Sequence, residues 1–87
     1  MKQDIQQIKE KVRGFITDRF LKNAGHNAPL DSTPLISGGI MDSISTMQLV
    51  TFLEKEFNFE FQAHEVDRDN LDTIDLISNF VASKTGE

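Results

Sequence analysis

Apolar residues recur at helical spacing in three stretches of the chain, and segments without that spacing separate them. In the first stretch, residues 3–22, the apolar positions fall at i, i+3, i+7, i+10 and i+11, which predicts an amphipathic helix. Asn23 and Gly25 are the stop signals that follow it. These apolar positions are Ile5, Ile8, Val12, Phe15 and Ile16, with Phe20 continuing the pattern.

Residues 24–42 carry two prolines and paired glycines, and they predict a long loop. A loop of this length is uncommon in a compact domain and is often functional. We expect its apolar residues to pin it to the core. These are Leu30, Leu35, Ile36 and Ile40.

A second helix is predicted over residues 43–57, with Asp42 or Ser43 as its cap. At about 100° per residue, one side of this helix forms a core stripe and the other side faces water. The core stripe is Thr46, Leu49, Val50, Leu53 and Phe57, and the opposite side holds Ile44, Met47, Gln48, Thr51 and Lys55. Ile44 and Met47 are therefore two exposed apolar residues beside Ser43, and they are a candidate docking patch.

The last third of the chain predicts a connection, a short turn and a third main helix. Residues 57–61 alternate phenylalanine with polar residues, and we interpret them as an extended connection whose rings plug the core. A short helical turn is predicted over residues 64–68 around Val66, and a helix over 73–83 with Asp72 as its N-cap and a frayed tail from Ser83. The pattern as a whole predicts an all-α fold: one monomeric domain, residues 1–87, in which three main helices and one short helix form a small bundle.

Composition narrows the possible functions. The chain has no cysteine, no apolar run of about 18 residues and no apolar leader, so we expect a cytoplasmic protein without a membrane span. The net charge of −5 is uneven: residues 1–41 hold six Lys/Arg and four Asp/Glu, whereas residues 42–87 hold three Lys/Arg and ten Asp/Glu. The acidic half disfavours nucleic acid and favours partners with basic patches.

Neither catalysis nor metal binding has a matching signature. The two histidines, His26 and His64, have no motif that pairs them with Ser43, so we expect no enzyme. The acidic run 67–72 fails as an EF-hand, because Leu71, Asp72 and Ser78 occupy positions that require an oxygen ligand, glycine and glutamate. We therefore expect no metal site and interpret the run as a solvated turn or part of a partner surface.

Three segments resemble the acyl carrier protein family. They are Gly39-Ile40-Met41-Asp42-Ser43-Ile44, Leu53-Glu54-Lys55-Glu56-Phe57, and Asn70-Leu71-Asp72-Thr73-Ile74 followed by Phe80-Val81. The family usually shows Gly, two residues and Asp-Ser-Leu, and later Leu-Glu-x-x-Phe. The resemblance covers essentially the whole chain, including helix order and loop length.

The resemblance implies that Ser43 carries a covalent 4′-phosphopantetheine group derived from coenzyme A, and that Asp42 assists the transferase that attaches it. The implied partners are a phosphopantetheinyl transferase, an acyl-loading ligase or acyltransferase, and downstream biosynthetic enzymes. These partners would contact Ile44, Met47, Gln48, Thr51 and Glu54. The protein would then hold a thioester and present it to enzymes.

The chain also departs from the carriers of fatty-acid synthesis, which usually have acidic residues at the positions of Ser45, Gln48 and Lys55 and leucine at Ile44. This favours a specialised pathway, whether polyketide-like, lipid-modifying or aminoacyl-loading, and leaves the cargo open. Ordinary fatty-acid carriage is one alternative. Another is an unmodified helical interaction module, in which Ser43 only caps a helix.

Overall fold

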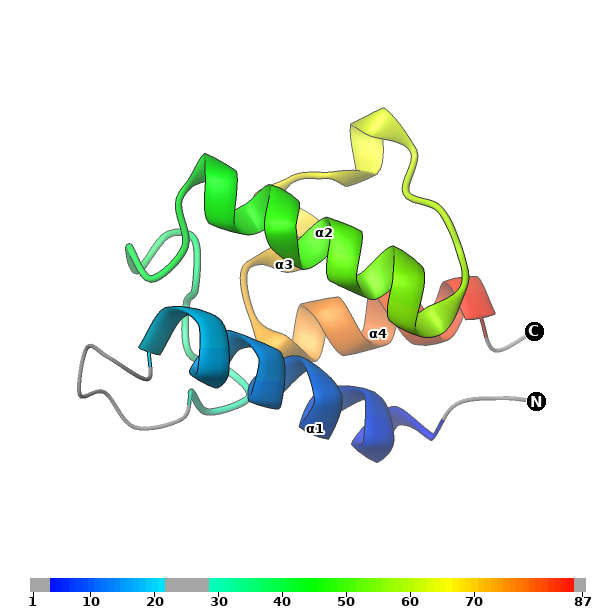
Figure 1. Cartoon of the computed structure of the whole chain (residues 1–87), viewed down its shortest axis with the longest axis horizontal. Coiled ribbons are helices and arrows are strands. Elements are labelled where there is room, and N and C mark those ends of the chain that lie inside the picture. Colours follow the sequence, from blue (N-terminus) through cyan, green and yellow to red (C-terminus); the bar gives the residue numbers. More distant parts are fainter. Residues whose placement is uncertain (1–3, 22–28, 86–87) are drawn as a thin grey trace.

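Three helices enclose the core of this protein in a computed structural model that describes residues 4–21 and 29–85. They are α1 (Ile5–Ile16), α2 (Ser43–Phe57) and α4 (Ile74–Thr85), and a short helix, α3 (Arg68–Leu71), precedes the last of them (Figure 1). A 3-10 turn at Ala63–Glu65 completes the set, and the described residues contain no strand. The all-α bundle with one long loop is confirmed.

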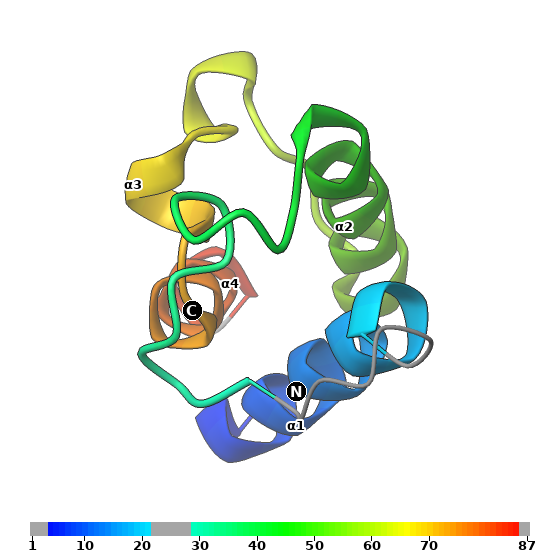
Figure 2. The ribbon, with the colours of Figure 1, turned by 90° about the vertical axis from the view of Figure 1, so that its left-hand side faces the viewer.

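The helices are arranged as a triangle when the bundle is viewed from the end (Figure 2). Helix α1 runs opposite to α2 and α4, and the segment with the 3-10 turn and α3 lies on the side away from α1. None of the helices in the described part of the chain combines the length and apolar character needed to cross a bilayer. The core consists of Ile8, Val12, Ile16, Leu35, Met41, Leu49, Val50, Leu53, Phe57, Leu71, Ile74, Ile77 and Val81.

Helix α1 begins two residues later than predicted, because the side chain of Asp4 caps it by accepting a hydrogen bond from the Gln6 N–H at 3.1 Å. After Ile16 the chain continues as a π-helical turn, Thr17–Leu21. The N–H of Thr17 is shared between two carbonyls of the preceding turn at this change. Residue 22, the stop signals Asn23 and Gly25, and His26 lie outside the described residues.

Helix α2 has the predicted bounds. Asp42 is its cap, since its Oδ1 accepts the N–H of Ser45 at 2.8 Å while its own backbone stays extended. The helix ends because Asn58 adopts the left-handed conformation (φ 57°), with its N–H bonded to the Glu54 carbonyl. All five residues of the predicted core stripe are buried.

Three predictions for the C-terminal third are wrong. The short helix occupies Arg68–Leu71 rather than residues 64–68, because Asp67, not an earlier residue, caps it through the N–H of Asn70. Asp72 does not cap α4; the hydroxyl of Thr73 accepts the Leu76 N–H at 3.0 Å instead, and the helix starts at Ile74. Helix α4 also continues to Thr85 rather than fraying from Ser83.

The loop and the connection after α2 follow their predictions except at one residue. Leu35 is fully buried, and Ile36 and Ile40 pack against the core, but Leu30 is 72 % exposed and pins nothing. In the connection, the ring of Phe61 stacks on Phe80 of α4 with centroids 5.0 Å apart, and Phe59 packs beside both.

Candidate functional site

Ser43 is the first residue of α2, at the point where the long loop becomes a helix, and it is exposed. The cap uses the N–H of Ser45, and the N–H of Thr46 bonds to the Asp42 carbonyl at 2.8 Å. The N–H of Ser43 has no acceptor among the described residues, whereas the N–H of Ile44 interacts with the Asp42 carboxylate. The free N–H of Ser43 and the positive end of the helix dipole suit an anion attached to the Ser43 hydroxyl.

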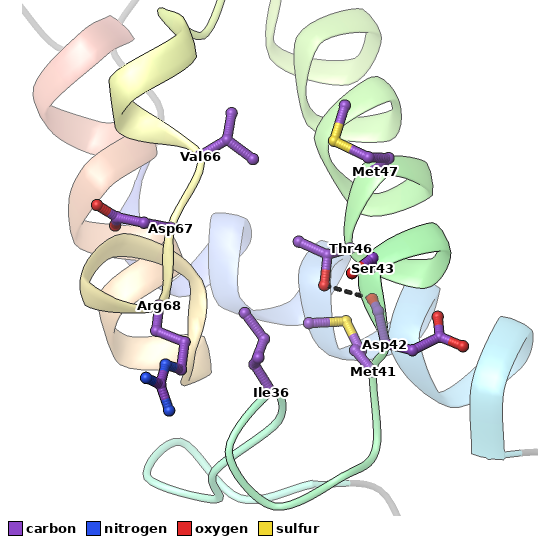
Figure 3. A pocket seen from close by; sticks show the side chains of 9 residues that line it. All are labelled: Ile36, Met41, Asp42, Ser43, Thr46, Met47, Val66, Asp67 and Arg68. Atoms are coloured by element: carbon purple, nitrogen blue, oxygen red, sulfur yellow. Dashed lines mark hydrogen bonds between the residues drawn. The ribbon is translucent and has the colours of Figure 1, made fainter.

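Asp42 supports this geometry as a charged cap. The hydrogen bond from the Ser45 backbone N–H is the main cause that holds the pKa of the Asp42 carboxyl below its ordinary value. The side chain points away from the cleft described below (Figure 3). The carboxylate is therefore ionised at neutral pH and accessible beside Ser43.

The conformation of the loop before Ser43 requires glycine at two positions, Gly38 and Gly39. Gly39 has a φ of +83°, a region that side chains disfavour, and its N–H donates to the Ile36 carbonyl at 3.1 Å. At Gly38, a Cβ atom would lie 2.2 Å from the backbone oxygen of Pro34, so a larger residue would force the loop apart. The tight turn that leads to Ser43 therefore depends on both glycines.

Asp72 fastens this loop to the junction between α3 and α4. Its Oδ1 accepts the N–H groups of Ile36 and Ser37 at 2.8 and 2.9 Å, and its Oδ2 accepts the Ser37 hydroxyl at 2.7 Å. Desolvation disfavours the charged form, but the hydrogen bonds from Ser37 and Ile36 outweigh it, so the pKa of the Asp72 carboxyl lies below its ordinary value. The backbone carbonyl of Asp72 also accepts the Leu35 N–H at 2.6 Å.

A second set of contacts holds the start of the loop. Lys9 of α1 pairs with Asp31 at 3.1 Å and with Asp75 of α4 at 3.0 Å, and Arg13 pairs with Asp31 as well. The hydrogen bond from Lys9 is the main cause that lowers the pKa of the Asp31 carboxyl. These partners are far apart in sequence and follow no local pattern, so the sequence analysis did not find them.

A cleft of about 470 Å³ opens beside Ser43, between α2 and the residues that lead into α3 (Figure 3). Apolar side chains from three segments line much of it: Ile36 and Met41 from the loop, Met47 from α2, and Val66 from the opposite wall. Arg68 lines the same opposite wall. The sequence analysis missed this cleft, because its walls come from segments that local patterns cannot place together.

The predicted partner face is largely one surface. Ile44 and Met47 are 72 % and 52 % exposed, and Gln48 and Thr51 continue the exposed side of α2 with them along a shallow depression. Glu54 differs: it is half-buried, and its carboxylate accepts the N–H of Phe61 at 2.9 Å. Its charge is therefore tied to the connection after α2.

The Ser43 hydroxyl forms no hydrogen bond with any described residue, so the described structure provides it with no base. His64 is exposed in the 3-10 turn and does not line the cleft.

No family model matches this sequence, and a search of curated proteins gave no significant match. The functional argument therefore depends on the residues and geometry of the site.

Proposed function

We propose that this protein is a carrier protein whose Ser43 receives 4′-phosphopantetheine from coenzyme A and then holds an acyl or aminoacyl group as a thioester. One observation carries the proposal: an exposed serine at a helix N-terminus adjoins the exposed apolar pair Ile44 and Met47, on the side of α2 that faces away from the core. The resemblance of the surrounding segments to acyl carrier proteins supports the same function.

The residues around Ser43 fit this attachment. Ser43 Oγ would attack the phosphorus that bears pantetheine, forming a new P–O bond while the pyrophosphate P–O bond breaks and adenosine 3′,5′-bisphosphate leaves. The hydroxyl proton would pass to a base of the transferase, since no described residue accepts it. The free N–H of Ser43 and the positive end of the α2 dipole would then stabilise the phosphodiester charge. When bound, the group supplies the terminal thiol to which the cargo is esterified.

Partner enzymes would dock on the exposed side of α2. Ile44 and Met47 supply the apolar contact, and Gln48 and Thr51 supply polar positions around it. These enzymes are a phosphopantetheinyl transferase, a loading ligase or acyltransferase, and the downstream enzymes that use the thioester. Glu54 would contribute mainly by orienting the connection through Phe61, since its carboxylate is already bound there.

A specialised pathway is the favoured context. Ser45 and Gln48 are uncharged. Lys55 carries a positive charge that no described residue neutralises through an ion pair. This side of α2 therefore carries little negative charge. A partner that relies on acidic residues at these positions would associate slowly.

The decisive experiment is intact mass spectrometry after incubation with a phosphopantetheinyl transferase and coenzyme A. We expect the wild type to gain one phosphopantetheine group, Ser43→Ala to gain none, and the matched control Ser45→Ala, in the same helical turn, to gain one. Circular dichroism should show that all three proteins are equally folded. A wild type that several transferases leave unmodified, or a Ser43→Ala variant that is still modified, would refute the carrier function. The unmodified result would favour an interaction module.

A further inference from the structure

The cleft beside Ser43 contains one cation without a partner. Among the described residues that line it, only Arg68 is basic. Arg68 is exposed, and its guanidinium forms no hydrogen bond or ion pair with any described residue. A guanidinium has five N–H donors arranged to bind a carboxylate through two parallel hydrogen bonds.

The acidic residues around Arg68 are engaged elsewhere. Asp42 and Asp67 also line the cleft, but each caps a helix, through the N–H of Ser45 at 2.8 Å and of Asn70 at 3.2 Å. Figure 3 shows both carboxylates pointing away from the space between the two walls, while the guanidinium of Arg68 lies along the lower edge of the opposite wall. Asp72 feels the charge of Arg68, which contributes to its lowered pKa, but both of its oxygens already accept hydrogen bonds from the loop. Arg68 is therefore the charged group of the described lining that no hydrogen bond engages, and a negative ligand that reaches the edge of the cleft could pair with it.

The positions of the lining residues suggest how such a ligand would lie. Ser43 is on the α2 wall, Arg68 is on the opposite wall, and Ile36 and Val66 reach into the space between the walls (Figure 3). The volume is within the range of about 300–1,000 Å³ that small-molecule sites occupy. A flexible group tethered at Ser43 would cross an apolar surface before its far end meets the guanidinium.

Resting on the proposed carrier function, we propose that Arg68 is a specificity-determining residue and that the cargo is an acyl group with a free carboxylate at its far end. Apolar side chains would hold the methylene part, and Arg68 would pair with the carboxylate. The phosphodiester at Ser43 is the other possible anion. It would lie at the free N–H of Ser43 and the N-terminal end of α2, and so it would leave Arg68 available for the cargo.

The test compares two cargoes of equal carbon number, one with and one without a carboxylate. A promiscuous phosphopantetheinyl transferase would load the full chain from glutaryl-coenzyme A or from valeryl-coenzyme A, and mass spectrometry would verify loading. NMR would then follow the Arg68 Nε–Hε signal and the pH titration of a ¹³C-labelled glutaryl carboxyl. We expect the Arg68 signal to move only with glutaryl, and the pKa of the glutaryl carboxyl to be lower by about half a unit than in Arg68→Gln.

Control variants separate the possible outcomes. Arg19→Gln removes an arginine that stacks on Phe15 away from the cleft, and it should titrate like the wild type. Equal Arg68 signals with glutaryl and valeryl, or an unchanged glutaryl pKa in Arg68→Gln, would overturn the proposal. It would also be overturned if the thiol-terminated arm alone moved the Arg68 signal as far as the glutaryl form does, because the phosphodiester would then be the anion. Failure to load any group on Ser43 would instead refute the carrier function.

Discussion

Ser37 and Asp72 are joined by two hydrogen bonds across 35 residues of sequence, from the Ser37 N–H at 2.9 Å and from its hydroxyl at 2.7 Å. The same carboxylate accepts the N–H of Ile36. The second half of the long loop is thereby fixed to the junction of α3 and α4. Because this half of the loop leads directly into α2, Asp72 also positions Ser43.

Replacing Asp72 by alanine should therefore destabilise the protein. The change leaves two backbone N–H groups of the loop without their acceptor, and we expect a loss of about 1–2 kcal/mol in the free energy of unfolding. Asp69→Ala is the matched control, since Asp69 is exposed and makes no side-chain hydrogen bond with a described residue; its effect should stay within about 0.5 kcal/mol. Urea unfolding measures both variants. Equal effects would show that the Asp72 hydrogen bonds contribute nothing to stability.

Acid should weaken the same contacts. The pKa values of Asp42 and Asp72 in the folded protein lie below the ordinary value of 3.8. A lowered folded pKa gives stability that is present above the unfolded pKa and is lost as the pH falls through the folded pKa. We therefore expect the stability difference between the wild type and Asp72→Asn to be largest near neutral pH and to shrink below pH 3.8. Urea unfolding at pH 7 and at pH 3 measures it, and an equal difference at both would contradict the assignment.

The sequence predicted α2 correctly because the signals that define this helix are local. Asp42 marks its start, and the apolar period separates the buried Leu53 from the exposed Met47 without knowledge of the other helices. The candidate attachment serine and the exposed apolar pair could be located for the same reason.

The contacts that hold the loop and form the cleft could not be predicted from such local signals. Asp72 occupies a typical capping position, but the loop competes for its carboxylate, and the neighbouring Thr73 caps α4 instead. Leu30 was expected in the core from its apolar character alone, yet it is exposed, whereas Leu35 and Met41 of the same loop are buried. The cleft and Arg68 depend on how distant segments pack, which a periodic pattern does not encode.

Ser78 lies fully buried on α4, and its hydroxyl has no hydrogen-bond partner in the described part of the chain. A buried polar group without a partner carries its full desolvation cost, and alanine has the higher helix propensity. We expect Ser78→Ala to raise the free energy of unfolding by about 1 kcal/mol, seen as a higher urea midpoint at an unchanged slope. Ser83→Ala, at an exposed position of the same helix, should change it by less than about 0.5 kcal/mol. A destabilised Ser78→Ala would mean that the hydroxyl is satisfied in solution.

The two sides of α2 should respond differently to substitution. Leu53 is fully buried, so Leu53→Ala should cost on the order of 2–5 kcal/mol, whereas Thr51→Ala on the exposed side should cost no more than about 0.5 kcal/mol. Met47→Asp should barely change the melting temperature but should strongly reduce loading by the cognate enzyme, because it puts a charge into the apolar docking pair. A large loss of stability in Met47→Asp would place that residue in the core and remove the argument for docking.

Charge on the exposed side of α2 should decide which enzymes use the protein. Lys55 and Arg19 line a groove along α2 together with Glu56, whose carboxylate pairs with Lys11, so this end of the face is less acidic than is usual in a fatty-acid carrier. The variant Ser45→Asp/Gln48→Glu/Lys55→Glu restores the acidic pattern. Charge at an interface rim mainly sets the rate of encounter, and salt screens it. We therefore expect a malonyltransferase of fatty-acid synthesis to load the variant faster than the wild type at low salt.

The advantage of the acidic variant should shrink at high salt. Gln6→Glu/Gln7→Glu, which adds negative charge on the exposed part of α1, is the control for overall charge and should give little gain. The initial rate of malonyl transfer to the phosphopantetheinylated proteins measures the effect. If the wild type is already as good a substrate as the acidic variant, the low charge of α2 does not exclude fatty-acid enzymes. Ordinary fatty-acid carriage would then replace the specialised pathway as the favoured context.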